Sequence, residues 1–156
     1  MIESERDLFV EQLRELYHIE RELEELQAEL AESATREELE EFYMAHGETT
    51  TDQIGRLEPI FDAIEAEVEP GTIDNTALEG LRAEREELID EFEDPTLADL
   101  TDAELGRAIE RLEITKLETL LTLADRLNLP EEVVDPLERT RDEAADGLER
   151  LQGVVQ

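Results

Sequence analysis

The chain has 156 residues, no cysteine, and 46 aspartates and glutamates against 14 lysines and arginines, for a formal net charge of -32. This length suits one domain over residues 1–156, the lack of thiols excludes disulfides and thiolate metal sites, and the charge repels phosphate backbones and anionic lipids. Because no segment is apolar over the length that a bilayer requires, we expect a soluble cytoplasmic protein without nucleic-acid or membrane partners.

The acidic residues are spread along the whole chain among apolar residues at helical spacing, which argues against a disordered acidic tail. Lys116 is the single lysine. At about 1 M salt the Debye length is roughly 3 Å, so the mutual repulsion of so many carboxylates is largely screened. The composition resembles that of proteins from salt-accumulating archaea and predicts a halophilic protein.

Apolar residues at alternating steps of four and three predict a first helix over residues 5–32, in which Glu20 takes a buried position. A second helix is predicted over residues 35–68. Pro59 lies inside it and removes one backbone hydrogen bond, so we expect a kink there without a break. The segment EPGTIDNT, residues 69–76, is typical of a loop.

A shorter amphipathic helix follows this loop. Thr101, with Glu104 three residues later, matches a capping box and predicts the start of a helix over residues 102–127. The segment NLPEEV places Pro130 in the first turn of a last helix that extends to about Leu151. Four long helices, with the short one in the long connection between the second and third, predict an all-α four-helix bundle.

Polar residues take buried positions near the middle of each long helix, where the helices of a bundle meet at one level. They are Glu20 in the first helix, His46, Thr49 or Thr50 and Gln53 in the second, Glu113 in the third, and Arg141 with Asp142 in the fourth. Inward carboxylates and imidazoles are typical ligands of dinuclear iron or manganese centres, whose usual set includes two Glu-x-x-His pairs. The predicted buried faces contain no such pair.

Five segments occur in an order and spacing that together are fairly specific. They are LFVEQLRELYHIERELEEL at residues 8–26, the H-x6-Q-x2-RLE pattern from His46 to Glu58, ALEGL at 77–81, DPTLADL at 94–100 and AIERLEITKLETL at 108–120. Over nearly its full length the chain thereby resembles the YciF-like (YciE/YciF) family of ferritin-like proteins. The resemblance implies a ferritin-like four-helix bundle, often a homodimer, that is associated with stress responses and has a dimetal centre.

Several positions agree with the family and several depart from it. The residue types are kept at Glu20, His46, Gln53, Glu110 and Glu113. Thr49 stands where the family has a glutamate, and Arg111 where it has a histidine. In the last helix Thr140 and Arg141 replace acids. The metal ligands that the resemblance implies here are Glu20, His46, Glu110, Glu113 and Asp142.

Two interpretations remain open from the sequence. In the first, which the ligand count slightly favours, the dimetal site is degenerate, and its carboxylates pair with Arg111 or Arg141 in a metal-free structural or interaction protein. In the second, the retained ligands hold one or two iron or manganese ions. Hydrolase chemistry is disfavoured, because the sequence has no cysteine, no glycine-bounded nucleophile and no phosphate-binding loop.

Overall fold

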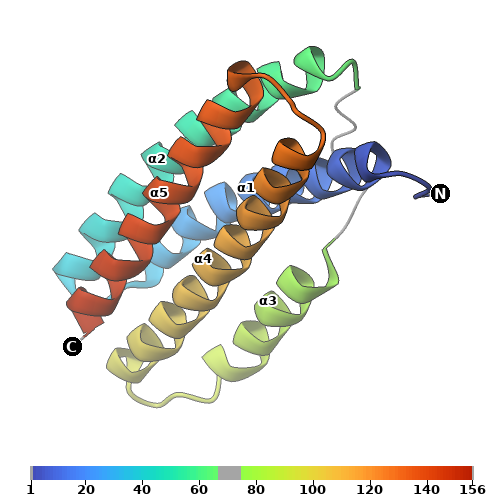
Figure 1. Cartoon of the computed structure of the whole chain (residues 1–156). Coiled ribbons are helices and arrows are strands. Elements are labelled where there is room, and N and C mark those ends of the chain that lie inside the picture. The colour runs from blue at the N-terminus through green and yellow to red at the C-terminus, as the bar shows by residue number, and fades with distance from the viewer. Residues whose placement is uncertain (1, 67–74, 156) are drawn as a thin grey trace.

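The computed structural model describes residues 2–66 and 75–155, and these residues form five α-helices. The helices are α1 (Glu5–Ser33), α2 (Glu37–Ala63), α3 (Thr76–Ile89), α4 (Pro95–Arg126) and α5 (Glu131–Val155). Both α1 and α5 pack against α2 and α4, which closes a four-helix bundle, while the short α3 lies along α4 (Figure 1). The predicted all-α bundle with a short helix in its long connection is confirmed. The loop predicted over residues 69–76 lies mostly outside the described residues.

The start of α4 differs from the prediction. The helix begins at Pro95, and the Asp94 side chain caps it by accepting a hydrogen bond from the Thr96 backbone N–H at 3.0 Å. Proline at the first helical position after an aspartate cap is a strong start signal, because its fixed φ is helical and its missing N–H is not needed there. The predicted start at Thr101 is therefore wrong, and this residue lies inside α4.

The start of α2 is capped by another helix. Its N-cap residue Arg36 makes no side-chain capping bond. Instead Asp99 of α4, which is 2% exposed, accepts hydrogen bonds from the backbone N–H groups of Thr35 at 3.0 Å and Arg36 at 3.2 Å. The hydroxyl of Thr35 donates to the same carboxylate at 2.5 Å. The turn between α1 and α2 is thus anchored to α4.

The helix α2 continues past Pro59, as predicted, and ends at Ala63, short of the predicted residue 68. It ends because Glu65 adopts a left-handed backbone with φ of 56°, which lets the Ala66 N–H return to the Phe61 carbonyl at 2.9 Å. Such a left-handed residue satisfies carbonyls that the last turn of a helix leaves without partners.

The apolar core consists of two clusters at opposite ends of the bundle. One contains Phe9, Leu13, Leu16, Leu57, Phe61, Leu117, Leu120 and Leu137, among others. The second contains Ile19, Leu23, Leu30, Leu39, Tyr43, Ile109 and Leu151, among others. In α2, α4 and α5 the segment between the contributions to the two clusters carries buried polar or small residues, and in α1 the buried Glu20 directly follows Ile19, so that a polar layer lies where the two clusters meet.

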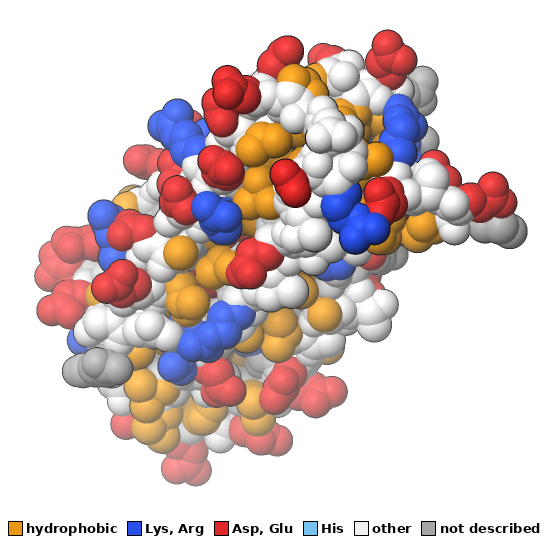
Figure 2. Space-filling model, viewed as in Figure 1, with side chains coloured by type: hydrophobic (Ala, Val, Ile, Leu, Met, Phe, Trp, Pro, Cys, Tyr) orange, Lys and Arg blue, Asp and Glu red, His pale blue; other side chains and the backbone are white. Residues whose placement is uncertain are grey.

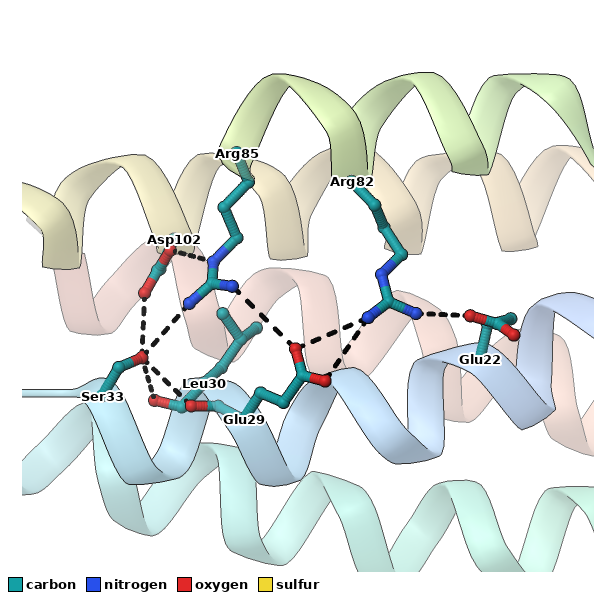
Figure 3. A network of polar contacts seen from close by, with 7 residues as sticks. All are labelled: Glu22, Glu29, Leu30, Ser33, Arg82, Arg85 and Asp102. Atoms are coloured by element: carbon teal, nitrogen blue, oxygen red, sulfur yellow. Dashed lines mark hydrogen bonds and ion pairs between the residues drawn. The ribbon is translucent and has the colours of Figure 1, made fainter. Parts of the chain in front are cut away.

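Two arginines hold α3 to the bundle (Figure 3). The Arg85 Nε donates to Asp102 of α4 at 2.7 Å, and the second oxygen of this buried carboxylate accepts from Ser33 of α1 at 3.3 Å. Arg82 pairs with Glu22 and Glu29 of α1. Only Leu78 of α3 is fully buried, so these ion pairs supply much of the attachment of this helix.

The surface matches the composition. Figure 2 shows acidic side chains over the whole visible face, with the basic ones scattered among them. In the described part of the chain, no helix is both long and apolar enough to cross a membrane.

We predict that Arg85→Ala destabilises the protein more than Arg82→Ala. The first change leaves the carboxylate of Asp102, only 3% exposed, without its cation, which should cost about 3 kcal/mol of unfolding free energy. The second removes pairs with partners that are 32% and 50% exposed, which should cost about 1 kcal/mol or less. Denaturant unfolding at one fixed salt concentration measures both, and equal losses would contradict the assignment.

Candidate metal centre

The polar layer between the two apolar clusters receives side chains from all four long helices. Its fully buried members are Glu20 from α1, His46, Thr50 and Gln53 from α2, Glu110 and Glu113 from α4, and Thr140 from α5. The helical repeat explains this, because each of these residues continues the inward-facing stripe that carries leucines and isoleucines above and below it.

Three glutamates of this layer lie close together. The exposed fractions of Glu20, Glu110 and Glu113 are 0%, 2% and 0%. The side chain of Glu113 lies within hydrogen-bonding reach of both Glu20 and Glu110. His46 joins them through a short contact between its Nε2 and Oε1 of Glu110. We call these four residues the carboxylate cluster.

Most of the carboxylate oxygens in this cluster have no hydrogen-bond donor among the described residues. Both oxygens of Glu20, both of Glu113 and Oε2 of Glu110 are buried without one. A buried ionised carboxylate without a partner is very costly, so each must share a proton or bind a cation.

The ionisation of the cluster reflects its burial. Burial, followed by the charge of the neighbouring carboxylate, raises the pKa of Glu20 and of Glu113 well above the ordinary value. Burial also raises the pKa of Glu110 to about 8. The pKa of His46 is lowered, again chiefly by burial. A metal-free cluster therefore holds protons at neutral pH, and a bound cation would have to displace them.

An ion pair borders the cluster on the α2 and α5 side. Arg56 donates to both oxygens of Glu143, at 2.6 and 2.8 Å, and Gln53 donates to Glu143 at 3.2 Å. The sequence analysis assigned no role to Arg56 or Glu143. One sequence signal could have found them. Arg56 directly precedes Leu57, and Glu143 directly precedes Ala144, each of which lies on the buried stripe of its helix.

The structure brings together four of the five ligands that the sequence implied: Glu20, His46, Glu110 and Glu113. The fifth, Asp142, lies outside the cluster. Its side chain is 73% exposed and contacts the neighbouring Arg141. The offset of one position along α5 turns Asp142 to solvent and Glu143 towards α2, since adjacent helical residues point about 100° apart.

The arginines that were expected to neutralise the carboxylates do not reach them. Arg111 is exposed, and the side chain of Arg141 is 38% exposed. The interpretation of either residue as the internal counter-ion is therefore wrong. Of the two predicted alternatives in α2, Thr50 is the buried one and donates to Gln27 at 3.1 Å, whereas Thr49 is partly exposed.

The donor types of the cluster fit a hard divalent transition metal. Three carboxylates and one imidazole suit iron or manganese, and the orphaned oxygens need a cation or protons. However, no group of three or more His, Asp or Glu side chains within residues 2–66 and 75–155 is arranged as a formed metal site. Metal binding would therefore require the cluster side chains to exchange their mutual contacts for metal–ligand bonds.

Residues 4–156 match the sequence profile of a family described as a domain of unknown function, DUF892. The chain is 31% identical to Protein YciF of Escherichia coli K12 over 121 residues, which are 78% of this chain and 72% of that protein.

Solved structures agree with this match. YcfI from Rhodopseudomonas palustris, described as a candidate structural protein, aligns with a TM-score of 0.89 at 27% identity over 97% of this chain and 94% of its own. The E. coli stress protein YciF aligns with a TM-score of 0.89 at 26% identity over 98% and 95%. The expected resemblance to the YciF-like family is therefore confirmed.

We predict that the unfolding free energy of the metal-free protein decreases as the pH rises from about 5 to about 8, and that Glu110 causes part of this decrease. In this range the unfolded chain ionises this residue, whereas the folded chain, with a pKa of about 8, keeps it protonated. The folded state binds more protons, so each such group lowers the unfolding free energy by up to about 1.4 kcal/mol per pH unit.

Chelator-treated wild type and Glu110→Gln, unfolded by denaturant across this pH range in the same salt, measure the effect. The variant should lose less stability as the pH rises, because the surface charges common to both proteins cancel in the comparison. Parallel pH profiles would show that Glu110 is already ionised in the folded state.

Proposed function

The chain belongs to the DUF892 family, and we propose that it is a stress-associated, ferritin-like bundle protein that binds one iron or manganese ion at the carboxylate cluster. The association with stress is carried over from the relative described as the E. coli stress protein YciF. The metal is inferred from the cluster itself. The site would have fewer ligands than a dinuclear centre and would hold one ion instead of two.

The observation that carries this proposal is the set of five buried carboxylate oxygens without a donor among the described residues. A metal-free network with an internal arginine would have satisfied them. The guanidinium of Arg56, whose charge acts on Glu20, is instead bonded to Glu143, and Arg111 is exposed. Three carboxyl groups buried close together destabilise a metal-free bundle, and a bound cation would compensate this cost by pairing with their oxygens.

The number of donors supports one ion. A dinuclear centre in a bundle usually has four glutamates and two histidines, whereas the cluster has three glutamates and one histidine. Thr49 and Asp142, at two of the positions where the family resemblance places acids, contribute nothing to the cluster. A bound iron or manganese ion would supply redox chemistry towards oxygen or peroxide.

The residues around the cluster have separate tasks in this proposal. Glu113 occupies the centre, because it reaches both Glu20 and Glu110. The ring of His46 is held by stacking on Phe42, with centroids 5.3 Å apart and planes 13° apart. The apolar clusters on either side exclude water, which strengthens each electrostatic interaction in the layer.

A metal-free structural protein with a degenerate site is the second candidate. It is favoured by the lack of a formed metal arrangement among the described residues and by the direct contact of His46 with Glu110. The relative from R. palustris, described as a candidate structural protein, agrees with it. In both cases we propose a homodimer that works in a cytoplasm of high salt concentration, on the basis of the family resemblance and the acidic surface.

Metal content distinguishes the two candidates. We expect elemental analysis of protein purified in molar salt, without chelator or affinity-tag metal, to find about one iron or manganese ion per chain. His46→Ala and Glu113→Gln each remove or neutralise a ligand and should lower the retained metal about tenfold or more.

Asp142→Asn is the matched control, because it removes an acid from the exposed side of α5 and should retain the wild-type metal content. Wild-type protein that holds no metal, even after incubation with Fe²⁺ or Mn²⁺ under argon, would contradict the proposal and leave the structural candidate.

A further inference from the structure

A cavity of about 200 Å³ lies between α2 and α5, directly beside the carboxylate cluster. Its walls are Phe42, Ala45, His46 and Thr49 from α2, and Glu143, Asp146, Gly147 and Arg150 from α5. It has room for several water molecules. Two carboxylates and one guanidinium line it, and both carboxylates are paired with arginines, Glu143 with Arg56 and Asp146 with Arg150. The preference for a cation over an anion therefore comes from the net charge of -32 on the whole protein.

His46 belongs to both the cavity and the cluster. Its ring forms part of the cavity wall, while its Nε2 contacts Glu110 on the inner side. The other cluster residues are sealed in the interior, with exposed fractions of 2% or less. The imidazole is therefore the wall between the cavity and the buried carboxylates.

The His46 ring can occupy this position because residue 147 is a glycine. A Cβ atom on Gly147 would lie 2.5 Å from Cε1 and 3.1 Å from Nδ1 of His46, closer than side chains pack. On its other side the ring stacks on Phe42, whose own side chain borders the same cavity. The ring thus stacks on Phe42, over which it can slide, and contacts Glu110. Gly147, which has no side chain, leaves space for it.

We propose that this cavity is the path by which a divalent cation enters the carboxylate cluster, with the His46 imidazole as the moving wall. The inference rests on the proposed metal binding and adds the route to it. Glu143 and Asp146 are the acids at the cavity wall, and each would exchange its arginine partner, Arg56 or Arg150, for the hydrated ion. Rotation of the imidazole away from Glu110 then opens the way to the orphaned oxygens. The return of the ring then closes the site against water.

The test is to fill the cavity without touching the cluster. In Thr49→Phe a ring occupies the cavity, and in the control Thr122→Phe the same ring is added on the exposed side of α4. Uptake of Co²⁺, followed by stopped-flow absorbance in molar salt, should be slowed about tenfold or more in Thr49→Phe with an unchanged final occupancy. The control should load at the wild-type rate. Uptake by Thr49→Phe at the wild-type rate would overturn the path.

A second measurement tests the path if neither the wild type nor the variants bind metal. Diethyl pyrocarbonate acylates neutral imidazole, and peptide mass spectrometry separates the two histidines, His18 and His46. Modification of His46 in the folded wild type, with protection in Thr49→Phe and equal modification of His18 in both, supports the path even where metal binding fails. A His46 that stays unmodified in the folded wild type, while His18 reacts, would show that the cavity gives no access to it.

Discussion

The structure depends on one constraint that opposes folding, which is the placement of three carboxyl groups close together at the middle of a bundle with almost no exposure to water. Burial favours the protonated form of each and leaves five oxygens without a donor among the described residues. Well-packed apolar residues of similar volume often replace buried charged groups with no loss, or with a gain, of stability. In the function proposed above a metal ion needs the three carboxyl groups, since hard oxygen donors beside an imidazole fit iron or manganese.

The surroundings of the cluster follow from this constraint. Apolar residues form one cluster above it and one below it, so the dry environment is continuous with the core. The Arg56–Glu143 pair lies at its edge, where both side chains keep some exposure, 17% and 27%, and a guanidinium can be accommodated without full desolvation. Gly147 and Phe42 border the histidine ring on its two sides. Each neighbour either excludes water or positions a donor.

The few basic residues have a related role in a chain with so many acids. Several join separate helices: Arg82 and Arg85 join α3 to α1 and α4, Arg56 joins α2 to α5, and Lys116 joins α4 to α1. In concentrated salt the exposed pairs are screened and contribute little, whereas those with buried partners, such as Asp102, keep their strength. The positions of the cations therefore determine how the outer helix stays attached.

The sequence alone determined the helices, their order and most of the cluster, because a period of 3.6 residues assigns Glu20, His46 and Glu113 to inward faces whatever their partners are. Glu110 was implied only by the family resemblance. The capping box at Thr101 predicted the wrong start for α4, because the stronger Asp94-Pro95 signal begins the helix earlier. Only the tertiary structure decided the rest. The cap that Asp99 gives to α2, the engagement of Arg56 by Glu143 in place of Arg111 or Arg141, and the space that Gly147 leaves for His46 all join residues far apart in the chain. Periodicity specifies which side of a helix a residue faces, but which side chain meets it there depends on how the helices pack.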